Sequence, residues 1–168
     1  MATATAAALL ASLSACGEPD AAATAQSISV DELESQVGEM YPAKDERTTV
    51  RVACEGELAA LEGASQECRV QVDKQRATVR VSVLAVVAEE VRIDSVLVVG
   101  AARVAKELLG ALADEGFQVD EVVCPGELLG RVGEEVTCTV TPNTGSGEVT
   151  ATVTKIRGLH VAFDYAVA

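Results

Sequence analysis

The residues of this chain whose chemistry depends most on spacing are its five cysteines. Four of them form two sets with thirteen residues between the partners: Cys54 with Cys68, and Cys124 with Cys138. The fifth, Cys16, stands alone near the start of the chain. Thiols with a partner can form a disulfide, hold a metal or exchange redox equivalents. Spacing is the first way to separate these three roles.

Structural zinc sites use cysteines that are typically about two to four residues apart, and redox motifs use Cys-x-x-Cys. Neither spacing occurs in this sequence, which also contains a single histidine. We therefore expect no metal site and no cofactor. Disulfide formation is the role that remains for two pairs of cysteines, with one cysteine left over.

The segments around the cysteines are two copies of one sequence. Residues 52–98 align without a gap with residues 122–168, and 12 of the 47 positions are identical. The identities include both cysteines, a Gly-Glu-Leu triplet and a glycine nine positions after the first cysteine. An internal repeat of this kind favours two modules of similar structure. Four cysteines allow three pairings, and duplication favours Cys54–Cys68 and Cys124–Cys138.

The single histidine is the one conventional catalytic side chain with a suitable neighbour. His160 and Asp164 lie four residues apart on one face of a predicted strand, and such a pair can orient an imidazole for proton transfer. The first copy has Glu90 and Asp94 at these positions, and no activated-serine motif, phosphate-binding glycine loop or EF-hand pattern accompanies them. We predict a surface histidine, no catalytic residue and a protein that is not an enzyme.

The chain begins with a short apolar stretch. Residues 1–15 are rich in alanine and leucine, and are fewer than the roughly 20 residues that a membrane-spanning helix needs. A run that ends in small residues is typical of an export signal, although no Lys or Arg precedes this one, so the true start lies upstream or the signal is weak. The alternative is an unprocessed alanine-rich terminus with an incidental cysteine.

Residues 13–17 (Leu-Ser-Ala-Cys-Gly) resemble the lipobox of bacterial lipoproteins, whose cysteine is acylated and becomes the new N-terminus. The resemblance implies a signal peptide over 1–15, a lipid on Cys16 and attachment to the outer face of the cytoplasmic membrane. Residues 16–27 then form a flexible tether, because they lack apolar periodicity.

The composition limits the class of partner. The chain has 26 acidic and 13 basic residues, a net charge of −13, and no basic stripe, so a nucleic-acid partner is not expected. The acids are spread along the chain, as on a solvated surface, with docking of a basic partner as the alternative. The hydrophobic fraction of 49% is that of a globular protein.

Two amphipathic helices are predicted, one in each module. Ser29 and Glu32 form a capping-box pattern before apolar residues at helical spacing, and Pro42 follows the predicted end. The second helix is predicted over 101–115, with Gly116 as its C-terminal stop.

Strands follow each helix. We predict one strand into the first cysteine, a helical turn over 57–61 or 127–132, a strand out of the second cysteine and a hairpin, over 148–154 and 159–167 in the second copy. Each module, 28–99 and 100–168, is thus an α+β unit with a helix on a four-stranded antiparallel sheet and one disulfide. Since no Pro- or Ser-rich linker separates the modules, we expect them to be fixed relative to each other.

The cysteine units resemble a domain-of-unknown-function family, number 4333, found in actinobacterial lipoproteins and membrane-anchored proteins. The residues that carry the likeness are 122–128, 132–133 and 136–140, with a looser match over 47–99. The family has no assigned activity, so the resemblance implies an envelope context. In architecture alone, two disulfide-bonded helix-and-sheet units are also similar to secreted beta-lactamase inhibitory proteins.

These observations predict a lipid-anchored, non-catalytic envelope protein. It would act as a binding or scaffolding module for another envelope component and contact the membrane through the lipid on Cys16. The alternative is an inhibitor-like or small-ligand-binding protein that uses the face between its two sheets, and an enzyme is the third possibility.

Overall fold

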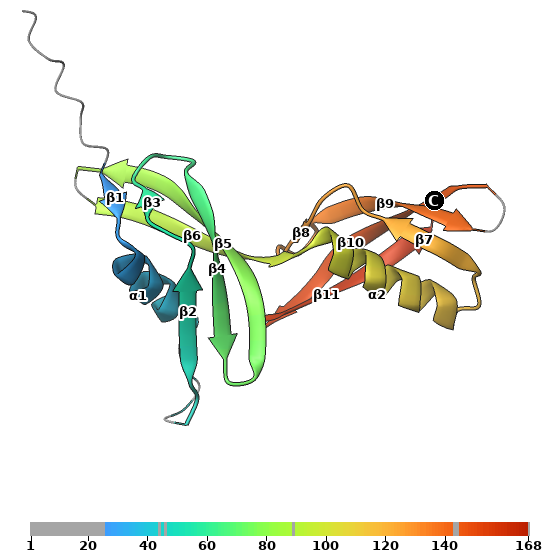
Figure 1. Ribbon diagram of the computed structural model, residues 1–168, viewed down its shortest axis with the longest axis horizontal. Coiled ribbons are helices and arrows are strands. Elements are labelled where there is room, and N and C mark those ends of the chain that lie inside the picture. Colours follow the sequence, from blue (N-terminus) through green and yellow to red (C-terminus); the bar gives the residue numbers. More distant parts are fainter. Residues whose placement is uncertain (1–25, 44, 46, 89, 143–144, 168) are drawn as a thin grey trace, which may run out of the picture.

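The computed structural model describes residues 26–43, 45, 47–88, 90–142 and 145–167. The two halves follow one another along the long axis of the molecule, each with one helix against an antiparallel sheet (Figure 1). The predicted α+β class, with one disulfide in each half, is confirmed. The elements are β1 (Ser27–Ile28), α1 (Val30–Met40), β2 (Val50–Cys54), β3 (Leu58–Ala59), β4 (Ser65–Val72), β5 (Gln75–Val87), β6 (Glu90–Val99), α2 (Ala101–Asp114), β7 (Val119–Val123), β8 (Leu128–Leu129), β9 (Glu135–Pro142), β10 (Gly147–Arg157) and β11 (His160–Val167).

The two sheets differ in one strand. The second module forms the four-stranded sheet β11-β10-β9-β7. The first module forms β2-β4-β5-β6, and this sheet gains β8 of the second module as a fifth strand beside β6. In the first module the equivalent of β8 is β3, which pairs with β1 in a separate two-stranded ribbon. The end of β6 therefore pairs with β8 of the second module in the way that β1 pairs with β3 of the first.

Helix α1 begins after Ser29, as predicted, and the hydroxyl half of the capping box forms. The Ser29 hydroxyl accepts a hydrogen bond from the Glu32 backbone N–H at 3.4 Å, and the Glu32 carboxylate accepts one from the Gln36 side chain. Leu33 and Val37, four residues apart, are fully buried. Burial of this stripe holds the helix against β2.

Helix α2 buries Val104, Leu108 and Leu112, as the periodicity predicts. It ends where Gly116 adopts a φ of 89°, a left-handed conformation that favours glycine. The N–H groups of Gly116 and Phe117 then bond the carbonyls of Ala113 and Leu112. This Schellman arrangement satisfies carbonyl groups that the helix end would otherwise leave unpaired.

The predicted helical turns over 57–61 and 127–132 are wrong. Two-residue strands, β3 and β8, occupy these positions and are followed by tight turns. Five or six residues are too few to stabilise a helix, and pairing with β1 or β6 buries Leu58 and Leu128 instead. The repeated Leu is thus a core residue in both modules.

The repeated glycine nine positions after the first cysteine also has a structural reason. Gly63 and Gly133 have φ values of 83° and 89°. Their N–H groups bond the carbonyls of Val83 and Val153, beside bulges at the same place in β5 and β10. A side chain at these glycines would strain the turn that bends each long strand.

The core is made of aliphatic side chains from both modules. Among the described residues no polar or charged residue is buried, and no helix is long and apolar enough to cross a membrane. Helix α1 packs on β2 and α2 packs on β7, which leaves parts of both sheets uncovered where the modules meet.

Candidate functional site

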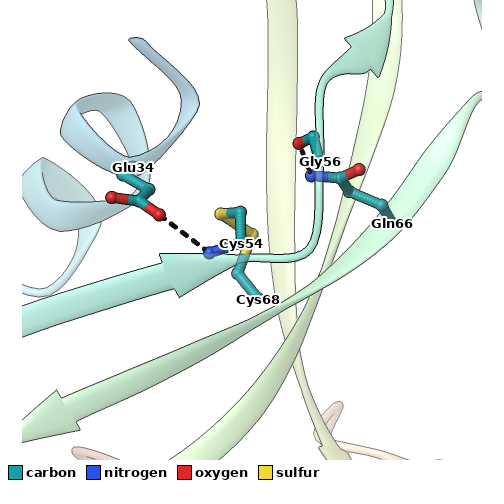
Figure 2. The surroundings of a disulfide bond; sticks show 5 residues. All are labelled: Glu34, Cys54, Gly56, Gln66 and Cys68. Carbon is teal, nitrogen blue, oxygen red and sulfur yellow. Dashed lines mark hydrogen bonds between the residues drawn. A yellow bond between two sulfur atoms is a disulfide. The ribbon is translucent and has the colours of Figure 1, made fainter. Parts of the chain in front are cut away.

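The four paired cysteines lie where the duplication places them. Cys54–Cys68 and Cys124–Cys138 are bonded, with S–S distances of 2.09 and 2.05 Å. Cys54 and Cys68 are direct cross-strand partners on β2 and β4, and the Cys54 N–H donates to the Glu34 carboxylate of α1 at 3.0 Å (Figure 2). The predicted lipidation residue, Cys16, lies outside the described residues.

His160 does not itself line either cavity at the module junction, although its chain neighbour Leu159 lines both and Val161 lines one. His160 is exposed at the start of β11, opposite Arg157 on β10. Asp164 is exposed further along the same strand, and within the described residues no hydrogen bond joins it to His160. The geometry does not bring these two side chains together as a proton-transfer pair.

A groove of about 500 Å³ lies at the junction of the two modules. Neighbouring positions on β2, β4, β5 and β6 form one side of it. The second module completes it with the start of α2, with Leu159 just before β11 and with Val161 in β11. Sites for small molecules have volumes of about 300–1,000 Å³. Both modules contribute arginine and apolar side chains to this groove.

Arginines dominate the polar side chains of this groove. Arg51, Arg69 and Arg76 come from three adjacent strands and Arg103 from the first turn of α2, while among the described residues no acid lines the groove. In cross-strand register Arg51 lies opposite Gln71, which lies opposite Arg76, so the three side chains share one face of the sheet. A chain of net charge −13 thus concentrates positive charge at one place.

The partners of these arginines are few and exposed. Arg76 donates its Nε–H to the Gln71 side-chain oxygen at 3.1 Å. Arg69 lies 3.9 Å from the Glu55 carboxylate, and Arg103 pairs with Glu107 one turn along α2. In the part of the chain that the structure describes, no carboxylate lies within ion-pair distance of Arg51 or Arg76.

The first turn of α2 differs in charge from that of α1. Helix α1 has the Ser29 cap and the acids Asp31 and Glu32 in its first turn. Helix α2 starts from Gly100, without a side-chain cap and with no acid in its first turn, and has Arg103 instead. The first turn of α2 therefore adds positive charge to the groove.

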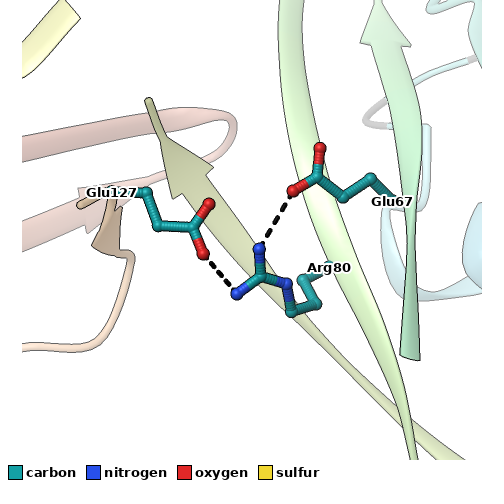
Figure 3. A network of polar contacts seen from close by, with 3 residues as sticks. All are labelled: Glu67, Arg80 and Glu127. Carbon is teal, nitrogen blue, oxygen red and sulfur yellow. Dashed lines mark hydrogen bonds and ion pairs between the residues drawn. The ribbon is translucent and has the colours of Figure 1, made fainter. Parts of the chain in front are cut away.

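Two ion pairs cross the junction beside the groove. Arg80 on β5 lies between the carboxylates of Glu67 on β4, at 3.0 Å, and Glu127 of the second module (Figure 3). The hydrogen bond with Glu127, followed by that with Glu67, holds the pKa of Arg80 above its ordinary value despite partial burial. Arg131 pairs in the same way with Asp94 on β6 at 3.4 Å.

Backbone contacts join the modules as well. Val98 and Val99 of β6 pair with Leu129 and Leu128 of β8, and the Gly130 N–H donates to the Leu97 carbonyl at 2.7 Å. These contacts support the prediction of a fixed arrangement, since shifting one module against the other would break strand pairing as well as side-chain contacts.

A second cavity, of about 630 Å³, shares Leu159 with the groove and lies between the end of α1, the β4–β5 turn and the β10–β11 turn. Its only charged lining residues among the described part of the chain are Asp73 and Lys74, which are of opposite sign. It lacks the concentration of one charge that distinguishes the arginine-lined groove.

Comparison with known families adds one result. Residues 11–87 match the model of a domain of unknown function, DUF4333. The match spans 77 of the 168 residues, including Cys16 and the first disulfide, and does not extend to the second copy. It thus falls on the copy whose motif is the looser one. No curated protein and no solved structure matches the chain.

Sequence reasoning did not find the arginine-lined groove. Its four arginines are spread from position 51 to 103, and no local motif connects them. A signal was available in the repeat, however. The arginines occupy positions at which the two copies differ. Positions that are identical in both copies hold residues that the shared fold needs, so they do not indicate a site that one copy has gained.

Proposed function

We propose that this protein is a lipid-anchored, non-catalytic binding protein of the cell envelope, and that it binds at the junction groove. The observation that carries the binding role is the groove itself, where both modules contribute arginines and no acid among the described residues lines the wall. A site made by two modules that are held together by strand pairing is pre-organised, which lowers the entropic cost of binding.

The envelope location rests on three separate observations. Residues 13–17 resemble a lipobox, and the family match includes this segment. The two disulfides fit an oxidising compartment outside the cytoplasm. Cys16 is the cysteine that neither disulfide uses, and we propose that it carries the diacylglycerol and palmitate of a lipoprotein after removal of residues 1–15.

We also propose that residues 100–168 are a diverged second copy of the matched domain in an actinobacterial lipoprotein. The support is the equivalent disulfide, the equivalent strand bulge and the equivalent glycine turn in the two halves. Divergence between the copies would allow the second to serve as scaffold while the first supplies most of the binding face.

The anchor is tested by mass spectrometry and fractionation in the native host. The expected results are membrane association, an acyl mass on Cys16, and release into the soluble fraction when Cys16 is replaced by alanine. Unchanged membrane association of the Cys16→Ala protein, with no acyl mass on the wild type, would reject the anchor.

Binding is tested by photo-crosslinking in intact cells. A photoreactive residue at Thr78, which lines the groove, should capture a ligand or partner, and one at Glu148, an exposed position in the second module, should not. Equal labelling from the two positions, or none from either, would argue against a binding role for the groove.

A scaffolding role has its own supporting observation. The hairpin of β5 and β6 exposes Leu84 and Val87, with 57% and 56% of their surfaces accessible. A third photoreactive residue at Val86 distinguishes this case, because a protein scaffold would be captured at the hairpin and a groove ligand would not.

A further inference from the structure

We propose that the junction groove recognises a small amphipathic anion, with an oxyanion head group such as a phosphate on an apolar body. This inference deepens the proposed binding function and is independent of the lipid anchor. Four arginine side chains would face the head group, and the aliphatic wall formed by Val98, Leu159 and Val161 would contact the body.

The fold does not require these arginines. The second module forms the four equivalent strands with Glu121 and Thr139 at the positions of Arg51 and Arg69, and has Ser146, just before β10, at the position of Arg76. Helix α1 likewise has Glu32 at the position of Arg103 in α2, when the helices are aligned at their first residues. The second module is thus the structural control for the three sheet arginines, and the first module is the control for Arg103.

The arrangement of the arginines favours an anion. Arg51 and Arg76 lie on either side of Gln71 on one face of the sheet, so two strand spacings of about 4.8 Å each separate them. Like charges on one face of a sheet repel each other. Among the described residues no carboxylate neutralises Arg51 or Arg76. An anion in the groove would relieve this repulsion.

The residue type points to an oxyanion. A guanidinium group presents several N–H donors in one plane, which match the oxygens of a phosphate or carboxylate in pairs. Arg76 uses its Nε–H on Gln71, a bond that orients the side chain beside the groove. Among the described residues that line the groove there is no lysine, which lacks this fork geometry.

The size and the apolar wall limit the ligand further. A volume of about 500 Å³ accommodates a small molecule. Leu159 and Val161 are nearly buried, and both reach the groove from the second module, so a bound apolar group would contact both modules at once. A bare inorganic anion would leave this wall unused, and a neutral amphiphile would bring no negative charge to the arginines.

The probe is decyl phosphate below its micellar concentration, with binding to residues 17–168 measured by calorimetry. Decyl glucoside and inorganic phosphate serve as the neutral amphiphile and the bare anion. We expect decyl phosphate to bind at least about tenfold more tightly than either. A charge-assisted hydrogen bond is worth roughly that factor over decyl glucoside, and burial of two or more CH2 groups is worth roughly that factor over inorganic phosphate.

The matched variants use residues that the second module already contains. Arg69→Thr with Arg76→Ser should weaken decyl phosphate binding at least about tenfold. The control, Arg92→Ser with Arg157→Ser, changes the net charge equally at exposed positions outside the groove and should bind like the wild type. Circular dichroism checks that both variants fold, and the three-probe comparison on the wild type tests the inference even where a variant does not.

Four results would overturn the inference: no binding of decyl phosphate, equal binding of decyl glucoside, equal binding of inorganic phosphate, or equal weakening in the control variant. These results leave the proposed function separately testable. A partner captured at Thr78 in cells, with no decyl phosphate binding, would retain the binding role and reject the ligand class. Binding of decyl phosphate with no capture at Thr78 would retain the ligand class and reject the binding role in cells.

Discussion

Replacing Gly130 with alanine would add one methyl group where the two modules meet. A Cβ at this position would lie 2.8 Å from Leu97 Cβ, 3.0 Å from Val161 Cγ2 and 3.2 Å from the Leu97 carbonyl oxygen. The equivalent residue in the first module, Ala60, carries such a methyl group and donates its N–H to Gln26 in the same way that Gly130 donates to Leu97. The crowding is therefore particular to the junction.

The size of the effect follows from these distances. Carbon atoms in favourable contact are about 3.5–4.0 Å apart, so the new methyl group must move by about 0.7 Å or more from Leu97 Cβ. Strand β8 cannot move freely, because Gly130 bonds Leu97 at 2.7 Å and β8 pairs with β6. Overpacking of this kind costs about 1–3 kcal/mol, and we expect Gly130→Ala to lose that much free energy of unfolding.

Urea unfolding followed by circular dichroism measures the loss. Gly126→Ala is the control, because a Cβ at Gly126 meets no atom within 4 Å. Adding Val161→Ala removes one of the crowding atoms, so Gly130→Ala should cost less in that background than in the wild type. If Gly130→Ala unfolds like Gly126→Ala, the modules are not held in the close contact that the structure shows, and the argument for a pre-organised groove fails with it.

Three further predictions concern the disulfides, the junction ion pairs and a partly buried phenol. Each disulfide joins residues 14 apart. By the chain-entropy argument, replacing either Cys54 and Cys68 or Cys124 and Cys138 with alanine should cost about 3 kcal/mol of free energy of unfolding. Clearly unequal losses in urea unfolding would contradict this. Arg80→Met breaks pairs with Glu67 and Glu127 whose side chains are about a third to half exposed, so the expected loss is below about 1 kcal/mol, and a larger loss in urea unfolding would mean that the junction depends on this arginine. Burial raises the pKa of Tyr41 above its ordinary value, although the hydrogen bond with Ser95 opposes this. The folded state therefore favours the neutral phenol. The contribution of Tyr41 to the free energy of unfolding is present below pH 10 and is lost as the pH rises through the folded pKa. Phenolate absorbance in a Tyr165→Phe variant reports Tyr41 alone, and a midpoint at or below 10 would refute that assignment.

Local patterns predicted the helices and the last strand because each depends on its own residues. Leu33 and Val37, four apart, identify the buried face of α1, and the alternation along β11 identifies its inward side. The repeated glycine turn and the cysteine pairing followed from duplication, since two copies of one sequence must satisfy the same geometry.

The short strands β3 and β8 could not be predicted in this way. Two residues carry no periodicity, and their partners, β1 and β6, lie about thirty residues away in the chain. The fifth strand of the first sheet comes from the second module, so its existence depends on how the modules sit together.

The sequence by itself determined that this chain is a duplicated, disulfide-bonded α+β protein with an acidic surface, because repeats, cysteine spacing and apolar periods are local properties that survive in one dimension. Only the tertiary structure decided where a ligand could bind. Arg51, Arg69, Arg76 and Arg103 are ordinary surface residues in the sequence. Strand register and the junction of two modules bring them to one groove, and charge acts through distance in space rather than separation along the chain.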